Sequence, residues 1–290
     1  MKFLMRKHFP APGGRKMSKL LSKVVVIAVI LLFGTLALQH QDFVGAQSTQ
    51  ANVQSKQGSS HTTTLLANSN ANPNMYAVVY DVTHHRYLSY GTPNLFLTGS
   101  SMKVAIMLTF LDMKEREGRS LTSHEYYLLR TMIENSNNDS ASELYYYGIG
   151  GAAGVTRYMH RIGITLLYPY AYAWGWSKIS PLAMVQMLTK LYEGTILNTY
   201  DRHLAFYYME HIEWDQRWGA GDTAPRGAVV AMKNGWVPGP DGLWNVNSSG
   251  IVMTSHETYI IATYTREQYS FGAGRALVQQ VCGQVASQLG

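Results

Sequence analysis

Acidic residues are missing from two long stretches of the sequence. None precedes Asp42, and none occurs between residues 144 and 192. Charged residues make up only 14% of the chain, and seven of its 24 Lys and Arg residues lie within residues 1–23. The rest of the chain then has 17 basic against 18 acidic residues, so the excess positive charge belongs to the N-terminal segment. This pattern gives no reason to expect nucleic-acid binding by the folded part.

Cysteine is nearly absent, and the single Cys282 excludes a disulfide within the chain. It lies in an apolar helical pattern, where a free thiol usually packs as a small apolar side chain. The histidines show no zinc-binding pattern either: His203 and His211 are eight residues apart, and His256 has no second histidine four residues later. No glycine-rich phosphate loop is present. We therefore expect no metal and no cofactor.

Only one long apolar run without charge occurs, at residues 24–38. Its fifteen residues are fewer than the roughly 17–25 of a membrane-spanning helix, and the run follows a basic segment, which is typical of a signal peptide. Val44, Gly45 and Ala46 are a candidate cleavage site. We expect residues 1–46 to be a basic leader and the rest to be exported, either secreted or tethered to the membrane at the cell surface through residues 24–38.

Residues 47–72 contain many Gln, Ser, Thr, Asn and Ala and almost no large apolar residue, which predicts a polar flexible tether. Residues 73–290 are long enough for one domain with a sizeable core. Strands at both ends around a helical middle predict an α+β domain: an antiparallel sheet of N- and C-terminal strands, packed with helices and carrying an inserted helical lobe. The patterns predict strands at 75–81, 86–90, 246–254 and 258–265, and helices near 101–118, 122–134, 139–149, 152–162, 180–193 and 272–289.

Three short motifs follow one another along this domain: S-x-x-K at residues 100–103, S-x-N at 136–138 and K-x-G at 233–235. A serine hydroxyl attacks a carbonyl only when a nearby base removes its proton. If Ser100 begins a helix, Lys103 lies on the same face, and the helix N-terminus places partial positive charge beside the attacked group. That charge and Lys233 would lower the pKa of Lys103, so that its neutral amine can accept a proton.

The other two motifs have a functional and a structural interpretation each. Ser136 and Asn138 alternate, so both can point at a substrate, one relaying a proton and the other hydrogen-bonding an amide; the alternative is that this segment caps a helix. Lys233 follows an apolar run at residues 228–232, which is consistent with an edge strand that lines a cleft. There Lys233 would attract a substrate carboxylate and Gly235 would let a ligand approach the backbone; the alternative is a solvated edge lysine.

With these motifs the chain resembles the penicillin-recognising serine enzymes, that is, class A β-lactamases and the penicillin-binding D,D-peptidases, over residues 73–290. The resemblance implies that Ser100 is acylated, that Lys103 is its base and that Ser136 passes a proton to the leaving nitrogen. It also implies substrate binding by five further residues and an oxyanion hole of the Ser100 and Trp236 backbone amides. The implied substrate-binding residues are Asn138, Lys233, Asn234, Gly235 and Trp236.

The sequence departs from this family at three places. Asn137 stands where the family usually has Asp, and Asn234 where it usually has Thr or Ser. The glutamate that activates the hydrolytic water in class A β-lactamases has no counterpart, because the acid-free stretch covers the loop that should carry it. A missing general base typically costs about 10²–10⁴-fold in the step it serves. We therefore expect acylation with slow deacylation of β-lactams. Glu134 and Asp139 lie close to the second motif; we expect them to cap or solvate a helix, and the alternative is that one of them is an unconventional base.

Three functions fit this pattern. The first is an exported serine hydrolase or acyl-transferase that forms an acyl-enzyme on a cell-wall peptide or a β-lactam amide. The second is a true class A-like β-lactamase, and the third is a penicillin-binding sensor or a binding domain without turnover. We expect a small-molecule or peptidoglycan-peptide substrate and no nucleic acid as partner, and the sequence gives no oligomeric state.

Overall fold

The computed structural model describes residues 63–64 and 72–289. The predicted leader and most of the predicted tether lie outside these residues, so the predictions of export, cleavage and membrane tethering stay predictions. Within the described residues, no helix combines the length and apolar character that crossing a membrane requires.

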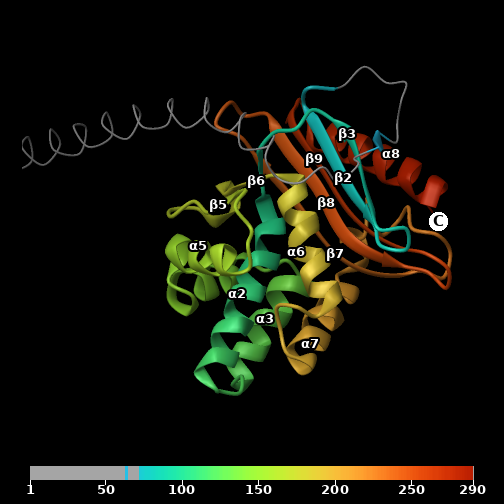
Figure 1. Ribbon diagram of the computed structural model, residues 1–290. Coiled ribbons are helices and arrows are strands. Elements are labelled where there is room, and N and C mark those ends of the chain that lie inside the picture. Colours follow the sequence, from blue (N-terminus) through green and yellow to red (C-terminus); the bar gives the residue numbers. More distant parts are fainter. Residues whose placement is uncertain (1–62, 65–71, 290) are drawn as a thin grey trace, which may run out of the picture. The chain divides into compact units, whose positions relative to one another are not determined.

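An antiparallel sheet built from both ends of the domain forms one half of the fold (Figure 1). The first long strand pairs with the last one, with Met75 opposite Thr265. This pairing confirms the predicted α+β class. In spatial order the antiparallel strands are β3 (Arg86–Gly91), β2 (Met75–Asp81), β9 (Thr258–Gln268), β8 (Trp244–Met253) and β7 (Val229–Pro238).

One further strand lies where the sequence predicts a tether. Thr63 and Thr64 form β1 (Thr63–Thr64), which pairs with β3 in parallel. These two residues of the predicted tether therefore pair with the edge of the sheet. The reason is that the outer edge of β3 presents backbone donors and acceptors that any passing extended segment can pair with.

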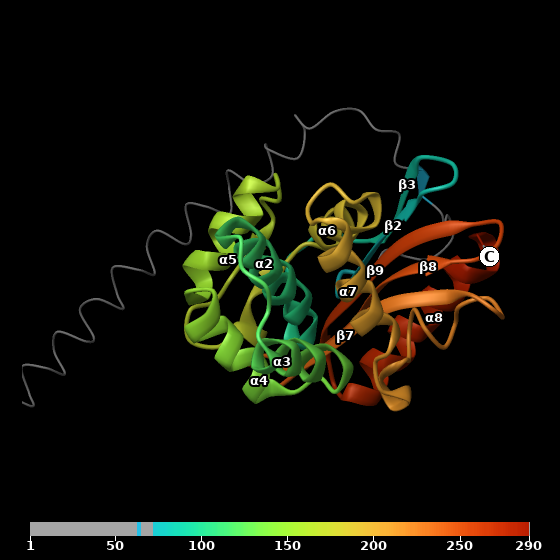
Figure 2. The same ribbon diagram turned by 90° about the horizontal axis from the view of Figure 1, so that it is seen from below.

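Both faces of the sheet are covered. Helix α8 (Phe271–Leu289) packs against β8 and β9, and α6 (Pro181–Glu193) packs against β2 and β9 from the helical lobe (Figures 1 and 2). Residues 245–252 of β8 are therefore all buried, instead of alternating between core and solvent. Cys282 lies on the inner side of α8 and is buried, as predicted, 3.6 Å from the Thr263 hydroxyl.

The helical lobe follows its sequence signals closely. Helix α2 (Met102–Glu117) ends at Gly118, which adopts the left-handed conformation that favours glycine. Thr122 and Glu125 form a capping box at the start of α3 (Ser123–Glu134). Helix α2 lies at the centre of the lobe, since its residues 102–111 are all buried. The lobe contains α2 (Met102–Glu117), α3 (Ser123–Glu134), α4 (Asn138–Ser142), the π-helical η2 (Glu143–Gly148), α5 (Gly151–Arg161) and α7 (Thr199–Glu210).

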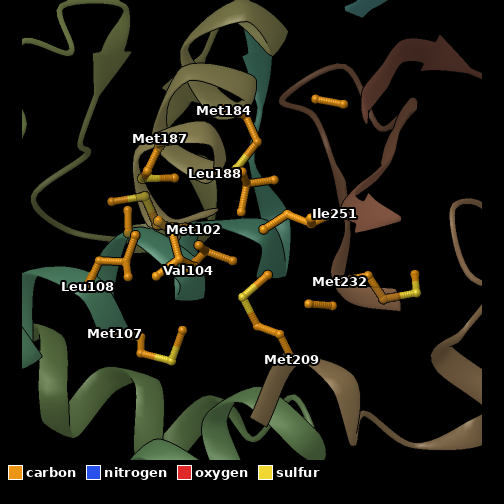
Figure 3. Packing of buried hydrophobic residues seen from close by; sticks show 14 of the residues in the cluster. Met102, Val104, Met107, Leu108, Met184, Met187, Leu188, Met209, Met232 and Ile251 are labelled. Carbon is orange, nitrogen blue, oxygen red and sulfur yellow. The ribbon is translucent and has the colours of Figure 1, made fainter. Parts of the chain in front are cut away.

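Methionine fills much of the core where the lobe meets the sheet (Figure 3). Met102 of α2 lies below Met184 and Met187 of α6, Met107 lies further down, and Met209 of α7 approaches from below. All of these side chains are fully buried. Unbranched thioether side chains fill irregular gaps, which suits a junction of three differently tilted helices and a twisted sheet.

Candidate active site

Ser100 lies in a short 3-10 turn, η1 (Gly99–Ser101), that leads directly into α2. Residues three apart are eclipsed in such a turn, so the Lys103 side chain comes to lie beside Ser100. The Lys103 Nζ is 3.1 Å from the Ser100 Oγ. The buried Ser101 hydroxyl holds the turn in place: it donates to the Thr98 carbonyl at 2.8 Å and lies 2.9 Å from the Tyr264 hydroxyl of β9.

The turn lies tightly against strand β7. A Cβ atom on Gly99 would be 2.6 Å from the Trp236 amide nitrogen, and one on Gly235 would be 2.2 Å from the Thr98 carbonyl oxygen. Gly99 also has a φ of +51°, which favours glycine. The close approach expected at Gly235 therefore exists, but it is made by the protein's own backbone, and it brings the Ser100 turn beside Trp236.

The second motif surrounds the Lys103 amine from the opposite side. The Lys103 Nζ lies 3.0 Å from the Ser136 Oγ, 2.5 Å from the Ser136 carbonyl oxygen and 2.8 Å from the Asn138 Oδ1. Ser136 adopts a φ of +54°, an uncommon conformation for a residue other than glycine, and this turns both its oxygens toward the lysine. Asn137 accepts a hydrogen bond from the Ser140 amide and caps α4. The predicted cap is thus real, but it belongs to Asn137 and leaves Ser136 and Asn138 free to contact Lys103.

Lys103 is completely buried among these oxygens. Burial and, to a smaller extent, the neighbouring charge of Lys233 together lower the pKa of its ammonium group to about 6. The direction agrees with the sequence prediction, although burial has the larger effect. Near neutral pH much of Lys103 is therefore an uncharged amine that can accept a proton from Ser100.

The third motif lies in the middle of β7, the edge strand of the sheet. Lys233 is completely buried, so the alternative of a solvated edge lysine is wrong. Its Nζ lies 3.5 Å from the Gln216 Oε1, and burial lowers its pKa to about 7 while Glu213 acts in the opposite direction. Asn234 is also buried, and its Nδ2 donates to the Gln216 and Trp218 carbonyls at 2.7 and 2.8 Å. Both of its donor hydrogens are thus engaged within the protein and do not face a substrate carboxylate.

Aromatic side chains surround the end of β7. Trp236 is partly buried and packs against Trp218 and Phe271, with ring centroids 6.1 and 5.5 Å away, and Trp244 packs against Phe271 at 6.0 Å. Trp236 and Trp244 are therefore two rings of one aromatic cluster. This cluster holds the Trp236 backbone beside the Ser100 turn.

Comparison with known proteins agrees with this arrangement. A family model described as "Beta-lactamase enzyme family" matches residues 121–289, which is more than half of the chain. The chain belongs to the beta-lactamase enzyme family. As a member it is a serine β-lactamase-type hydrolase. No curated protein sequence matches it.

Solved structures of β-lactamases show the same fold at low sequence identity. The TLA-3 extended-spectrum β-lactamase has 17% identity and a TM-score of 0.67, over 77% of this chain and 94% of its own. A β-lactamase from Chitinophaga pinensis has 20% identity and a TM-score of 0.66, over 75% and 94%. The structure of PBP-A has 18% identity and a TM-score of 0.64, over 75% and 91%.

Trp174 lies beside Lys103, and the sequence did not predict this contact. The ring of Trp174 is centred 5.0 Å from the Lys103 Nζ, and its Nε1 donates to the Ser142 Oγ at 3.1 Å. The Thr98 amide donates to the Ser177 carbonyl at 2.9 Å and holds this loop against the turn that precedes Ser100. An indole accepts no proton at ordinary pH. Trp174 was recognisable in the sequence only as one of many packing aromatics.

Glu213 is the second residue that sequence reasoning missed. Its carboxylate accepts hydrogen bonds from the Asn135 Nδ2 at 2.8 Å and the Gln216 Nε2 at 3.1 Å. Its charge also raises the pKa of Lys233. It lies far from all three motifs along the chain, so no local pattern could identify it.

Of the alternative bases, Glu134 is bonded to Arg130, and Asp139 is exposed in the first turn of α4.

Among the described residues, one group has the composition of a metal site. Asp81, His84 and Glu257 bring ligand atoms within 4.8 Å of one another at the turns between β2 and β3 and between β8 and β9. The buried Asp81 carboxylate already accepts hydrogen bonds from Arg86 at 2.8 Å and from His84. The Arg86 guanidinium therefore already supplies the positive charge beside Asp81 that a metal ion would bring. The group shares no residue with the Ser100 site.

Proposed function

We propose that this member of the β-lactamase family is an exported serine acyl-transferase or hydrolase that forms an acyl-enzyme at Ser100. Its substrate is an amide of a cell-wall peptide or of a β-lactam. One observation carries the proposal: a single amine with a lowered pKa, on Lys103, contacts the hydroxyls of Ser100 and Ser136 at once.

Acylation requires a proton to move from the nucleophile to the leaving nitrogen. The neutral Lys103 takes the proton of Ser100 as its Oγ forms a bond to the carbonyl carbon. The backbone amides of Ser100 and Trp236 stabilise the oxyanion that develops. Lys103 then returns the proton through the Ser136 hydroxyl to the amide nitrogen, and the carbon–nitrogen bond breaks.

Substrate positioning falls to the side chains around this path. Asn138 is exposed, accepts a hydrogen bond from Lys103 through Oδ1 and keeps its amide hydrogens for a substrate carbonyl. Lys233, when protonated, attracts a substrate carboxylate. Gly235 lets the Ser100 turn lie against β7, and Asn234 fixes the segment that contains Gln216 and Trp218.

Release of the acyl group is the slow step of the proposed reaction. Hydrolysis needs a base that removes a proton from water, and the indole of Trp174 lies beside Lys103. An amine acceptor that enters the cleft carries its own nucleophile, so transfer depends less on a fixed carboxylate. This favours an acyl-transferase, a D,D-peptidase or a penicillin sensor over a fast β-lactamase.

Intact-mass spectrometry of the full chain tests the proposal. The wild type and Ser100→Ala are mixed with a penicillin and followed over minutes to hours. We expect an adduct of one penicillin mass on the wild type alone, and its persistence over many minutes. An equal adduct on Ser100→Ala contradicts the assigned nucleophile, and rapid loss of penicillin without any adduct supports the alternative of a true β-lactamase.

A further inference from the structure

A cavity of about 320 Å³ opens in the helical lobe, between α2 and α5. We call it the α2–α5 pocket; its lining includes Asp112, Arg116, Ile149, Arg157, Tyr158 and Arg161. Asp112 lies nine residues beyond Lys103, roughly 13 Å along the same helix. The pocket therefore shares no residue with the Ser100 site and lies toward the opposite end of α2.

Two helices contribute arginines to the lining of this pocket, and Arg116 and Arg157 among them are exposed. Arg157 and Arg161 are four residues apart and share one face of α5, and Asp112 and Arg116 are related in the same way on α2. Arg161 is bonded to Asp112. Arg116 and Arg157 form no ion pair with any carboxylate in the part of the chain that the structure describes. Two guanidinium groups at the pocket thus keep their positive charge without a direct partner.

The second acidic residue at the pocket does not change this balance. Glu117 lies 3.7 Å from Lys114 and 3.4 Å from Arg119, so its charge is shared with two cations outside the lining. The pocket therefore favours an anion.

Tyr158 adds an independent indication of a ligand. The side chain is 1% exposed and lines the pocket, and its hydroxyl has no hydrogen-bond partner. Burial raises the pKa of this phenol, so it stays a neutral donor. Buried donors nearly always have an acceptor, and the oxygen atoms of an anion would supply one. Met113 and Ile149 add apolar surface to the same lining.

We propose that the α2–α5 pocket binds a phosphate group, held by Arg116 and Arg157 with Arg161 beside them. The donors of a planar guanidinium group match the spacing of two phosphate oxygens, so that one arginine can bind both oxygens at once. The volume lies at the lower end of that of small-molecule sites, roughly 300–1,000 Å³, which accommodates a phosphate with a short apolar substituent. The phosphate has two possible sources, free phosphate or a phospholipid headgroup.

Isothermal titration calorimetry of the full chain separates these sources. The probes are inorganic phosphate and a short-chain phosphatidylglycerol below its micelle concentration. We expect saturable binding to the wild type, and binding at least roughly tenfold weaker in the Arg116→Ala/Arg157→Ala double variant. Arg226→Ala removes an exposed arginine outside the pocket and should leave the affinity unchanged. Arg157→Gln alone, with a smaller loss, serves if the double variant fails to fold.

Each outcome decides the proposal. Tighter binding of phosphatidylglycerol supports a lipid headgroup, and equal or tighter binding of inorganic phosphate supports a free phosphate. The proposal is overturned if neither probe saturates, or if Arg226→Ala weakens binding as much as the pocket variants, since that shows general charge attraction. Acylation of Ser100 by penicillin is measured in parallel, and its failure concerns the proposed function alone.

Discussion

The Lys103 amine has four oxygen neighbours, more than the three hydrogens of its protonated form or the two of its neutral form, and two of these neighbours are the hydroxyls of the proposed proton path. We expect Lys103→Ala to slow acylation by penicillin by about 10²–10⁴-fold, because the base for Ser100 is lost. The rate of adduct formation measures this, with Lys190→Ala on α6 as a control away from the site. A rate within twofold of the wild type contradicts the role of Lys103.

The two buried lysines predict a narrow pH optimum. Acylation needs neutral Lys103, so its rate should fall as pH drops through about 6. Binding of a substrate carboxylate needs charged Lys233, so the rate should also fall as pH rises through about 7. Stopped-flow acylation between pH 4.5 and 8.5 tests both limbs. Lys233→Gln should lose the alkaline limb, and a rate that stays constant down to pH 5 contradicts the lowered pKa of Lys103.

Trp174 offers a direct test of why deacylation is slow. Trp174→Glu places a carboxylate near Lys103, and we expect it to speed release of the penicilloyl group by about 10²-fold. Trp174→Gln is the matched control, similar in size but without a base. If Gln speeds release as much as Glu, then the indole acts by excluding water and the lack of a base is not the limiting factor.

Residue spacing was sufficient to predict the contact between Ser100 and Lys103, because helix geometry fixes it locally. The place of Ser136 and Asn138 beside them followed from the resemblance to the family, since these contacts join residues far apart in the sequence. Other features of the site depend on the tertiary structure. The positive φ of Ser136 has no signature in a serine side chain. Trp174 reaches Lys103 only because Thr98 and Ser142 hold its loop in place, and both are distant in sequence.

At the scale of elements, the contact between η1 and β7 sets the geometry of the site. Gly235→Ala would place a methyl group 2.2 Å from the Thr98 carbonyl oxygen, so the turn that carries Ser100 must shift. We expect a loss of about 1–3 kcal/mol in the free energy of unfolding, together with slower acylation. Urea denaturation and penicillin labelling measure the two effects.

Gly272→Ala is the control for this variant. Gly272 lies at the start of α8, and the nearest atom to an added Cβ is the Ser270 Oγ at 3.8 Å. Stability should stay the same or rise slightly, since alanine favours the helix. Equal losses in both variants would show that the contact with η1 has no special weight.

The strongest periodic patterns predicted their elements well, and weak ones did not. Strand β2 and helix α3 were predicted to within about one residue. Helix α7 was missed because aromatic residues lie on both faces: Tyr208 is buried, but Tyr200 and Tyr207 are exposed. The small sheet of β4 (Phe96–Leu97), β6 (Lys178–Ile179) and β5 (Leu167–Tyr168) was also missed, since two-residue strands leave no periodicity to read.

For the molecule as a whole, the buried lysines make stability depend on pH. The unfolded chain holds a proton on each lysine up to about pH 10.5, whereas the folded chain releases them above about 6 and 7. Between these values the unfolded state binds more protons, so the free energy of unfolding should rise with pH. The slope is at most about 1.4 kcal/mol per pH unit for each lysine.

Urea denaturation between pH 7.5 and 8.5 measures this slope below the range in which buried tyrosines and Cys282 begin to act in the opposite direction. Lys103→Met and Lys233→Met should each be more stable than the wild type at pH 7.5 and show a smaller slope. An unchanged slope in the Lys103→Met/Lys233→Met double variant contradicts the burial of charge at these positions.

The pairing of β2 with β9 has a consequence for how the domain is made. Met75 finds its partner Thr265 only after nearly the whole domain has been synthesised. The central hydrogen-bond ladder of the sheet therefore cannot close on a growing chain, and contacts this distant along the sequence form slowly. A nascent chain therefore stays without its finished sheet until residue 268 has left the ribosome.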